Sequence, residues 1–260
     1  MTTPTMKSPA GRPLQRRAWV EQVMGLPVSI HLRGEAIDES RSSAAVQAAY
    51  ATLRRLEGIF STYRTDSEVM RLRRGELSID ECSDEVRDVL GVGELAEQRT
   101  CGAFTTLLPT GAGDLAFDPT GLVKGWAVER AARELVGLAG LSYCINAGGD
   151  LMIGVGADLP LSGPGSISWR VGIEDPRNRS AIAGTVQMTH GAVATSGTAA
   201  RGAHLYDPAT GEHVGRSGSV TVMGPELVWA DIWATALFVG GERARDAFAL
   251  AAPDYLSTAL

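Results

Sequence analysis

The sequence predicts an α+β fold in which mainly antiparallel strands, in mixed sheets with flanking helices, form two interleaved subdomains. The expected strands outnumber the helices that could connect them as crossovers. Strands and helices also do not alternate regularly, as a doubly wound parallel fold requires. No clear linker, internal repeat or low-complexity segment divides the 260 residues. We therefore expect a disordered lead-in over residues 1–18 and a single domain over residues 19–260.

The first expected elements are a hairpin over residues 19–33 and a helix over residues 39–58. In the hairpin, Val28, Ile30 and Leu32 alternate with polar residues, which is the two-residue period of a half-buried strand. One apolar stripe runs along the helix, and a serine near its start could act as the N-cap. The stripe consists of Val46, Ala49, Tyr50, Leu53 and Leu56. The candidate caps are Ser40, Ser42 and Ser43.

A loop and a short helix are expected within residues 60–75, and a longer helix begins at Ser83. Inside the longer helix, residues 91–96 read G-V-G-E-L-A and superficially match a dinucleotide-binding fingerprint. That fingerprint has to follow a strand, whereas the residues before it continue a helical stripe. Glu94 would also repel a pyrophosphate. We therefore reject a dinucleotide site at this position.

The chain from residue 114 onward is richer in strands and glycine turns. A strand, a tight turn and a helix are expected over residues 114–140, followed by a strand, a glycine turn and a strand over residues 143–154. Further strands are expected within residues 168–176, 184–197 and 218–224. The C-terminal part predicts two helices, at about 226–239 and 242–251.

The bulk composition argues against several classes of function. The formal net charge of −6 gives no reason to expect a nucleic-acid partner. No apolar run approaches the roughly 20 residues of a membrane span, and no apolar segment follows Arg16 and Arg17 to make a secretory signal. The three cysteines lack C-x-x-C spacing and nearby histidines, so neither a zinc site nor a disulfide framework is expected. We expect a cytoplasmic protein without membrane insertion.

The apolar helix around residues 226–240 carries two oxygen-bearing side chains on one face. Asp231 and Thr235 are four residues apart, about one helical turn. Both are hard oxygen donors of the kind that Mg²⁺ takes, and a buried carboxylate is costly unless something pairs with it. Alternatively the pair is structural, with Asp231 bonding a neighbouring loop and Thr235 bonding back to its own helix.

Two glycine-containing turns also concentrate polar groups. In residues 117–131, Gly121 and Gly125 flank Lys124 at the start of a helix, where free N–H groups and a lysine suit a phosphate. Residues 146–150 read N-A-G-G-D, and the two glycines let a ligand approach the backbone closely. Each segment could instead be an ordinary turn.

A third polar segment spans residues 194–211. Thr195, Ser196 and Gly197 offer hydroxyl and N–H groups, and Arg201 offers an anion clamp. His204 is the one histidine in this segment. A lone histidine is commonly structural, but histidine is also the usual general base near neutral pH.

Five segments in this order resemble the ApbE family, the Mg²⁺-dependent FAD:protein FMN transferases. They read FSTYRTDSEVMRL, FDPTGLVKGWAVERA, NAGGDLMIG, ATSG…R…HLYDPATG and ADIWATALFVG. Each is weak alone, but five in order are specific. The resemblance runs from about Met24 to the C-terminus and implies an ApbE-like fold over the domain.

The resemblance implies that the chain uses FAD as a substrate together with Mg²⁺. The FMN moiety would move to a Thr or Ser hydroxyl of a target flavoprotein, with release of AMP. By motif matching, His204 is the candidate base and Lys124 a donor to the phosphates, while Asp231, Thr235 and the Val123 carbonyl are metal ligands. The positions implied to contact FAD are Met24, Ser61, Tyr63, Lys124, Asn146, Gly148, Gly149, Asp150, Thr195, Ser196, Gly197, Arg201 and His204.

The chain departs from the family pattern at three places. It has T-G-L-V-K-G where G-G-I-A-K-G is usual, and Thr198 where an Asp usually follows T-S-G. The usual G-A-F-D-P-T is G-A-F-T-T-L, and the stretch after it is shortened. These changes bear on the expected pocket for the adenine of FAD and on docking of the acceptor protein more than on the expected metal site. Two other hypotheses remain: an FAD pyrophosphatase that yields FMN and AMP, and a non-enzymatic FAD-binding protein.

Overall fold

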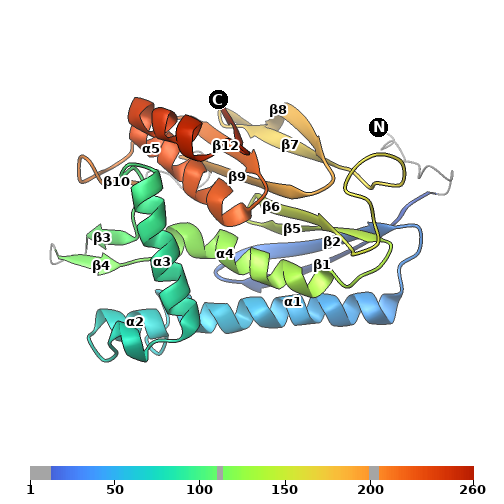
Figure 1. The fold of residues 1–260 in the computed structure, drawn as a ribbon, viewed down its shortest axis with the longest axis horizontal. Coiled ribbons are helices and arrows are strands. Elements are labelled where there is room, and N and C mark those ends of the chain that lie inside the picture. Colours follow the sequence, from blue (N-terminus) through green and yellow to red (C-terminus); the bar gives the residue numbers. More distant parts are fainter. Residues whose placement is uncertain (1–12, 110–113, 199–204) are drawn as a thin grey trace.

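The computed structural model describes residues 13–109, 114–198 and 205–260. Within these ranges a seven-stranded sheet runs in the order β1-β2-β5-β6-β9-β12-β13, and all neighbouring pairs are antiparallel. Its strands are β1 (Gln15–Val23), β2 (Leu26–Gly34), β5 (Leu141–Ala147), β6 (Asp150–Val155), β9 (Gly191–Gly197), β12 (Ser219–Gly224) and β13 (Leu256–Ala259). Strands from both ends of the chain thus share one sheet, in which they lie in the same order as in the chain, with the N-terminal strand at one edge and the C-terminal strand at the other (Figure 1).

Three helices pack on one face of this sheet, with α4 between α1 and α5 (Figure 1). They are α1 (Glu39–Phe60), α4 (Thr120–Ala132) and α5 (Leu227–Ala251). Two shorter helices extend this layer, α2 (Glu68–Arg73) and α3 (Asp84–Arg99), with the 3₁₀ turns η1 (Ile79–Glu81) and η2 (Arg133–Leu135). None of the described helices has the length and apolar character needed to span a bilayer.

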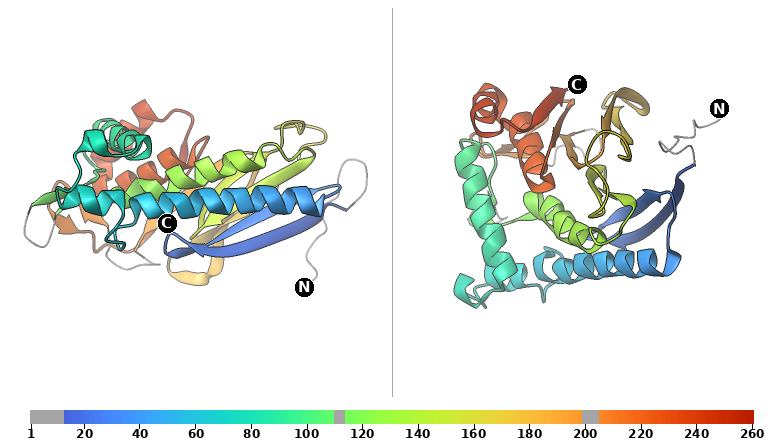
Figure 2. Two further views of the ribbon diagram at one scale, coloured as in Figure 1. Left: turned by 90° about the horizontal axis from the view of Figure 1, so that it is seen from below. Right: turned by 45° about the vertical axis from the view of Figure 1, so that its right-hand side comes forward.

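The opposite face of the sheet is partly covered by a hairpin of β7 (Trp169–Asp175) and β8 (Asn178–Met188). Figure 2 gives two further views of this arrangement. Because successive side chains of a strand point to opposite faces of the sheet, β5 contributes to two apolar clusters. Tyr143 and Ile145 belong to the main core beneath the helices, whereas Cys144 belongs to a smaller cluster with Trp169. Two further hairpins pair β3 (Leu107–Pro109) with β4 (Leu115–Phe117) and β10 (Tyr206–Asp207) with β11 (Glu212–His213).

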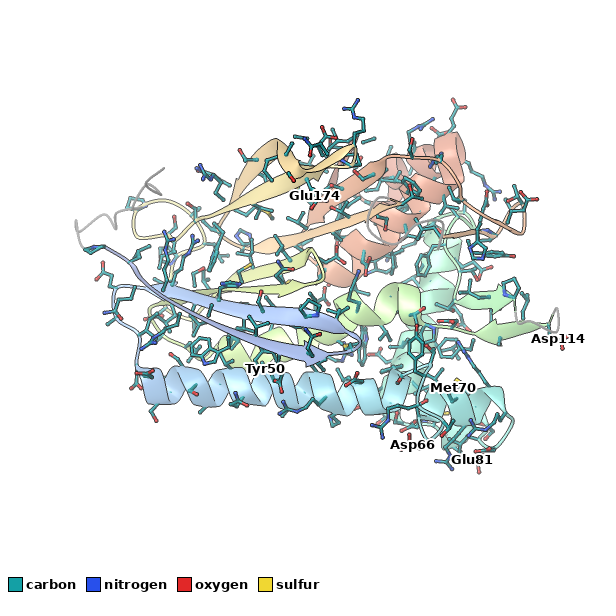
Figure 3. The ribbon with its side chains drawn as sticks, turned by 180° about the vertical axis from the view of Figure 1, so that it is seen from behind. Tyr50, Asp66, Met70, Glu81, Asp114 and Glu174 are labelled. Carbon is teal, nitrogen blue, oxygen red and sulfur yellow. The ribbon has the colours of Figure 1, made fainter. Side chains whose placement is uncertain are left out.

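The expected stripe on α1 forms part of the main core, and its five apolar residues are all buried. Tyr50, labelled in Figure 3, donates a hydrogen bond from its hydroxyl to the Val28 carbonyl at 3.0 Å and so ties α1 to β2. The predicted serine caps are wrong. Asp38 is the N-cap, because its carboxylate accepts the Arg41 amide, and Ser42 is buried in the helix.

The predicted lead-in is too long at its C-terminal end. Residues 15–18 belong to β1 and pair with residues 31–34 of β2. These side chains are exposed on an edge strand, so no apolar alternation marks them in the sequence. Residues 1–12 lie outside the described residues.

Candidate active site

Lys124 joins three elements at the end of the central sheet. It lies early in α4, and its ammonium forms ion pairs with Asp150 at the start of β6 and with Asp231 of α5. The Asp231 Oδ2 atom is 3.4 Å from the Lys124 Nζ atom. The two carboxylate side chains are only 3% and 6% exposed, and that of Lys124 is 22% exposed. Three predicted site residues are thereby brought together.

The N-A-G-G-D turn positions Asp150. Gly148 and Gly149 have φ angles of +63° and +104°, which a side chain would strain. The Asn146 side-chain oxygen accepts the Gly149 amide at 2.9 Å and closes the turn. The Asp150 Oδ1 atom accepts the Thr195 amide at 3.0 Å, which links this turn to β9.

The face of α5 that carries Asp231 and Thr235 meets the next residue of β9. The Thr235 and Ser196 hydroxyl oxygens are 2.8 Å apart and hydrogen-bonded. Because side chains alternate across a strand, Ser196 points to the helices while Thr195 points to the opposite face, where its hydroxyl bonds that of Thr221 at 2.9 Å. Strand β9 therefore contacts both halves of the site.

The start of α5 is held by α4. A Cβ atom at Gly125 would lie 2.9 Å from both the Leu227 carbonyl oxygen and the Val228 Cα atom, so the close approach of the two helices requires glycine. The Glu129 carboxylate accepts the Val228 amide at 2.9 Å and so caps α5 from outside the helix. Burial raises the pKa of Glu129, and hydrogen bonds from the Val228 and Leu227 amides oppose that rise.

We expect Glu129→Ala to lower the free energy of unfolding by roughly 0.5–2 kcal/mol, the usual effect of losing an N-cap. The cause is that the Val228 amide loses its acceptor. Urea unfolding of the variant and the unsubstituted protein measures the change. An unchanged midpoint would show that Glu129 does not stabilise the start of α5.

A cavity of about 940 Å³ opens on the sheet face opposite the helices, beneath the β7–β8 hairpin. Glu174, labelled in Figure 3, lies on this hairpin and contributes to the lining. The lining includes six of the residues predicted to contact FAD, namely Asn146, Gly148, Gly149, Asp150, Thr195 and Gly197.

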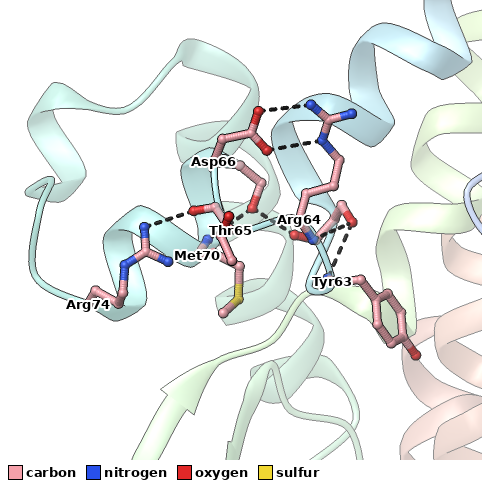
Figure 4. Close-up of polar contacts among 8 residues, drawn as sticks. Tyr63, Arg64, Thr65, Asp66, Met70 and Arg74 are labelled. Atoms are coloured by element: carbon pink, nitrogen blue, oxygen red, sulfur yellow. Dashed lines mark hydrogen bonds and ion pairs between the residues drawn. The ribbon is translucent and has the colours of Figure 1, made fainter.

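Other predicted residues lie outside this lining. Met24 occupies the β1–β2 turn with a φ angle of +56°. Ser61 follows α1 and its hydroxyl accepts the amides of Tyr63 and Arg64. Figure 4 shows this loop, in which Arg64 pairs with Asp66 and the Tyr63 ring points away from the polar contacts. Tyr63 is 95% exposed. The predictions for Arg201 and His204 fall outside the described residues.

The part of the cavity lining that comes from β2 was not predicted as a functional site. Ser29, His31 and Arg33 share the β2 face that lines it, and the Arg33 guanidinium lies 3.8 Å from the centre of the Trp169 ring. Burial, and then the charge of Arg33, lowers the pKa of His31. The sequence does show these polar residues alternating with Val28 and Ile30. Such alternation does not by itself indicate a binding site, because the polar face of an antiparallel strand usually faces solvent.

The oxygen donors on α5 suit a hard divalent cation. Asp231 supplies a buried carboxylate, and Thr235 supplies a hydroxyl one turn later that is already oriented by Ser196. Val123 lies one residue before Lys124 in α4, so its carbonyl belongs to the same region. Among the described residues no group of three or more His, Cys, Asp or Glu could hold a metal, but the predicted set uses only one such side chain.

If Thr235 ligates Mg²⁺, as the sequence predicts, we expect Ser196→Ala to raise the Mg²⁺ concentration needed for half-maximal activity about tenfold, because loss of a partner that orients a metal ligand commonly has this effect. The Thr235 hydroxyl would lose its 2.8 Å partner. Activity titrated against Mg²⁺ tests this, with Ser166→Ala as the control because the Ser166 hydroxyl bonds the Gly163 carbonyl in a loop outside the cavity lining. Equal midpoints in the Ser196 variant and the unsubstituted protein would contradict the orienting role.

Comparison with known proteins decides the family. The model of the ApbE family matches residues 24–110 and 105–257. The chain belongs to the ApbE family. The family resemblance and the α+β fold class predicted from the sequence are thus confirmed.

Relatives of this ApbE-family chain include two curated proteins named FAD:protein FMN transferase. The one from Escherichia coli K12 is 32% identical over 145 residues, and the one from Vibrio cholerae is 30% identical over 140 residues. These matches cover 51% and 50% of this chain but only 39% and 40% of the relatives.

Solved structures of ApbE proteins share the fold over most of this ApbE-family chain. The ApbE protein of Thermotoga maritima superposes with a TM-score of 0.75 at 21% identity and covers 94% of each chain. The apo flavinyl transferase ApbE of Pseudomonas stutzeri gives a TM-score of 0.72 at 22% identity over 95% of each chain.

Proposed function

We propose that this chain is a Mg²⁺-dependent FAD:protein FMN transferase that joins FMN to a Thr or Ser hydroxyl of a target flavoprotein and releases AMP. The observation that carries the proposal is the convergence of Lys124, Asp150 and Asp231 where β6, α4 and α5 meet, beside the cavity. The names of the curated relatives give the same activity for those proteins.

The reaction breaks the bridging bond of the FAD pyrophosphate and forms a bond between the FMN phosphorus and the acceptor oxygen. AMP leaves with the bridging oxygen. Such a transfer depends mainly on positioning and on neutralising charge at the phosphates. The Lys124 ammonium is suited to donate to the non-bridging oxygens, and His204 would take the proton from the attacking hydroxyl.

The ligands proposed for Mg²⁺ are Asp231, Thr235 and the Val123 carbonyl. The buried carboxylate and the hydroxyl held by Ser196 fit a hard cation. When bound, Mg²⁺ would supply Lewis-acid neutralisation of the pyrophosphate.

We place FAD along the glycine turn and the β9 segment. Asn146, Gly148, Gly149, Thr195 and Gly197 all line the cavity, which is large enough for part of such a ligand. The remaining FAD contacts are proposed for Met24, Ser61, Tyr63, Ser196 and Arg201. The three cysteines are free thiols, which fits a reducing compartment such as the cytoplasm.

Incubation with FAD, Mg²⁺ and a panel of candidate flavoproteins tests the proposal. We expect fluorescent flavin on one acceptor in a denaturing gel, dependent on both FAD and Mg²⁺. Free FMN and AMP formed at catalytic turnover without a labelled acceptor would favour the pyrophosphatase. Tight FAD binding with no turnover would favour a non-enzymatic flavin-binding protein.

A further inference from the structure

The Asp150 carboxylate is engaged by the protein on both of its oxygens. The residue is 2% exposed. Its Oδ1 atom accepts the Thr195 amide at 3.0 Å, and its Oδ2 atom contacts the Lys124 ammonium. Both oxygens of this carboxylate are thus already held by protein groups, although Asp150 stands in a segment implied to contact FAD.

The backbone fixes where this carboxylate lies. Asp150 pairs with Ala147 as the first residue of β6, directly after Gly148 and Gly149. The next residue, Leu151, pairs with Val193 of β9, which places Asp150 beside the Thr195 amide. The carboxylate therefore lies at the meeting point of two sheet strands and not on a free loop.

Lys124, by contrast, has a long side chain that needs restraint. A lysine carries four rotatable methylene groups, so its ammonium is placed by its partners more than by its own stem. Here Asp150 lies on β6 and Asp231 lies on α5, and the ammonium contacts both. With 22% of its side chain exposed, Lys124 remains accessible to a ligand at the edge of the site.

We propose that Asp150 is a positioning residue that acts through Lys124: it holds the ammonium where the FAD pyrophosphate binds, and it does not contact FAD itself. This inference rests on the proposed function, since FAD is the ligand that Lys124 is expected to meet. It gives the Asp of the N-A-G-G-D turn a different role from that of its neighbouring glycines.

A double-mutant cycle on FAD affinity tests this. Lys124→Met, Asp150→Asn and the double variant are titrated with FAD in the presence of EDTA, with flavin fluorescence as the readout. We expect each single change to weaken FAD binding about tenfold, as loss of a charge-assisted contact does. We expect the double variant to bind like Lys124→Met alone, because Asp150 has no other route to the ligand.

Asp150→Asn keeps an oxygen for the Thr195 amide and replaces the charged oxygen that faces Lys124 with an uncharged NH₂ group. The matched control is Asp88→Asn, which removes the carboxylate in contact with Arg130 on the same helix, α4. We expect the control to leave FAD affinity unchanged within about twofold. Losses that multiply in the double variant would show that Asp150 contacts FAD directly and would overturn the inference.

Thermal unfolding of the same four proteins separates this inference from the proposed function. If the unsubstituted protein binds no FAD, the proposed function is wrong, but the pairing of Asp150 with Lys124 is still measured. We expect the double variant to lose less in Tm than the sum of the two single losses, because Lys124→Met alone leaves the buried Asp150 charge without its ammonium and the double variant does not. Strictly additive losses would contradict the positioning pair, whatever the ligand.

Discussion

Asp231→Asn is expected to lower the rate of FMN transfer at fixed Mg²⁺ by about 100-fold or more, because Lewis-acid assistance by a bound metal contributes roughly several kcal/mol to such a reaction. The substitution keeps the shape of a side chain that is 6% exposed while it removes the anionic oxygen proposed to bind the cation. The measurement is the initial rate of AMP release across a range of Mg²⁺ concentrations. Raising Mg²⁺ should restore part of the rate.

The control for Asp231 is Asp246→Asn, on the same helix beyond the break at Gly241. Asp246 is exposed and follows Asp231 by 15 residues in the chain, so its variant should keep the original rate and Mg²⁺ dependence. If Asp231→Asn retains full activity at ordinary Mg²⁺, the metal assignment on α5 is wrong.

Trp233→Ala is expected to lower the free energy of unfolding by about 3–5 kcal/mol, the range for truncating a buried tryptophan. The Trp233 side chain is 1% exposed, and its ring meets that of Phe248 edge-on with centroids 5.3 Å apart. It therefore joins the two segments of α5 on either side of Gly241. Urea unfolding followed by circular dichroism measures the loss.

Trp229→Ala provides the comparison on the same helix. Trp229 is only partly buried and lies beneath the Arg99 guanidinium at 4.5 Å. Its truncation should cost clearly less than that of Trp233, because less apolar surface returns to water. Equal losses in the two variants would mean that burial does not set the contribution of these residues.

Much of the fold could be predicted because local periodicity and turn residues agree with the tertiary structure. The stripe on α1, the glycine turn between β5 and β6, and the break near Gly241 all lie where the sequence predicts them. The rejected fingerprint at residues 91–96 lies inside α3, as its helical stripe indicated.

The elements that were not predicted are short or exposed. Strand β13 has four residues and lies at the sheet edge, so its strand state comes from pairing with β12 and not from a local pattern. The beginning of β1 at Gln15 is explained in the same way. Edge pairing of this kind is a tertiary interaction that propensity does not encode.

The sequence could single out a set of candidate site residues but not their arrangement. The sequence singled out Lys124, Asp150 and Asp231, yet nothing in their spacing indicated that one ammonium contacts both carboxylates. The role of Glu129 as the cap of α5 depends on the packing of two helices, which brings its carboxylate to the Val228 amide, 99 positions later in the chain. Such partners are set by the topology of the fold.

The most direct test of the central claim is the ratio of AMP released to flavin bound covalently to an acceptor, measured in one reaction with FAD and Mg²⁺. FMN transfer predicts one AMP for each flavin on the acceptor, with mass spectrometry locating the flavin on a Thr or Ser. It also predicts that Asp231→Asn lowers both quantities together. AMP released in large excess over bound flavin, in the presence of the acceptor, would contradict the account and indicate hydrolysis of FAD instead.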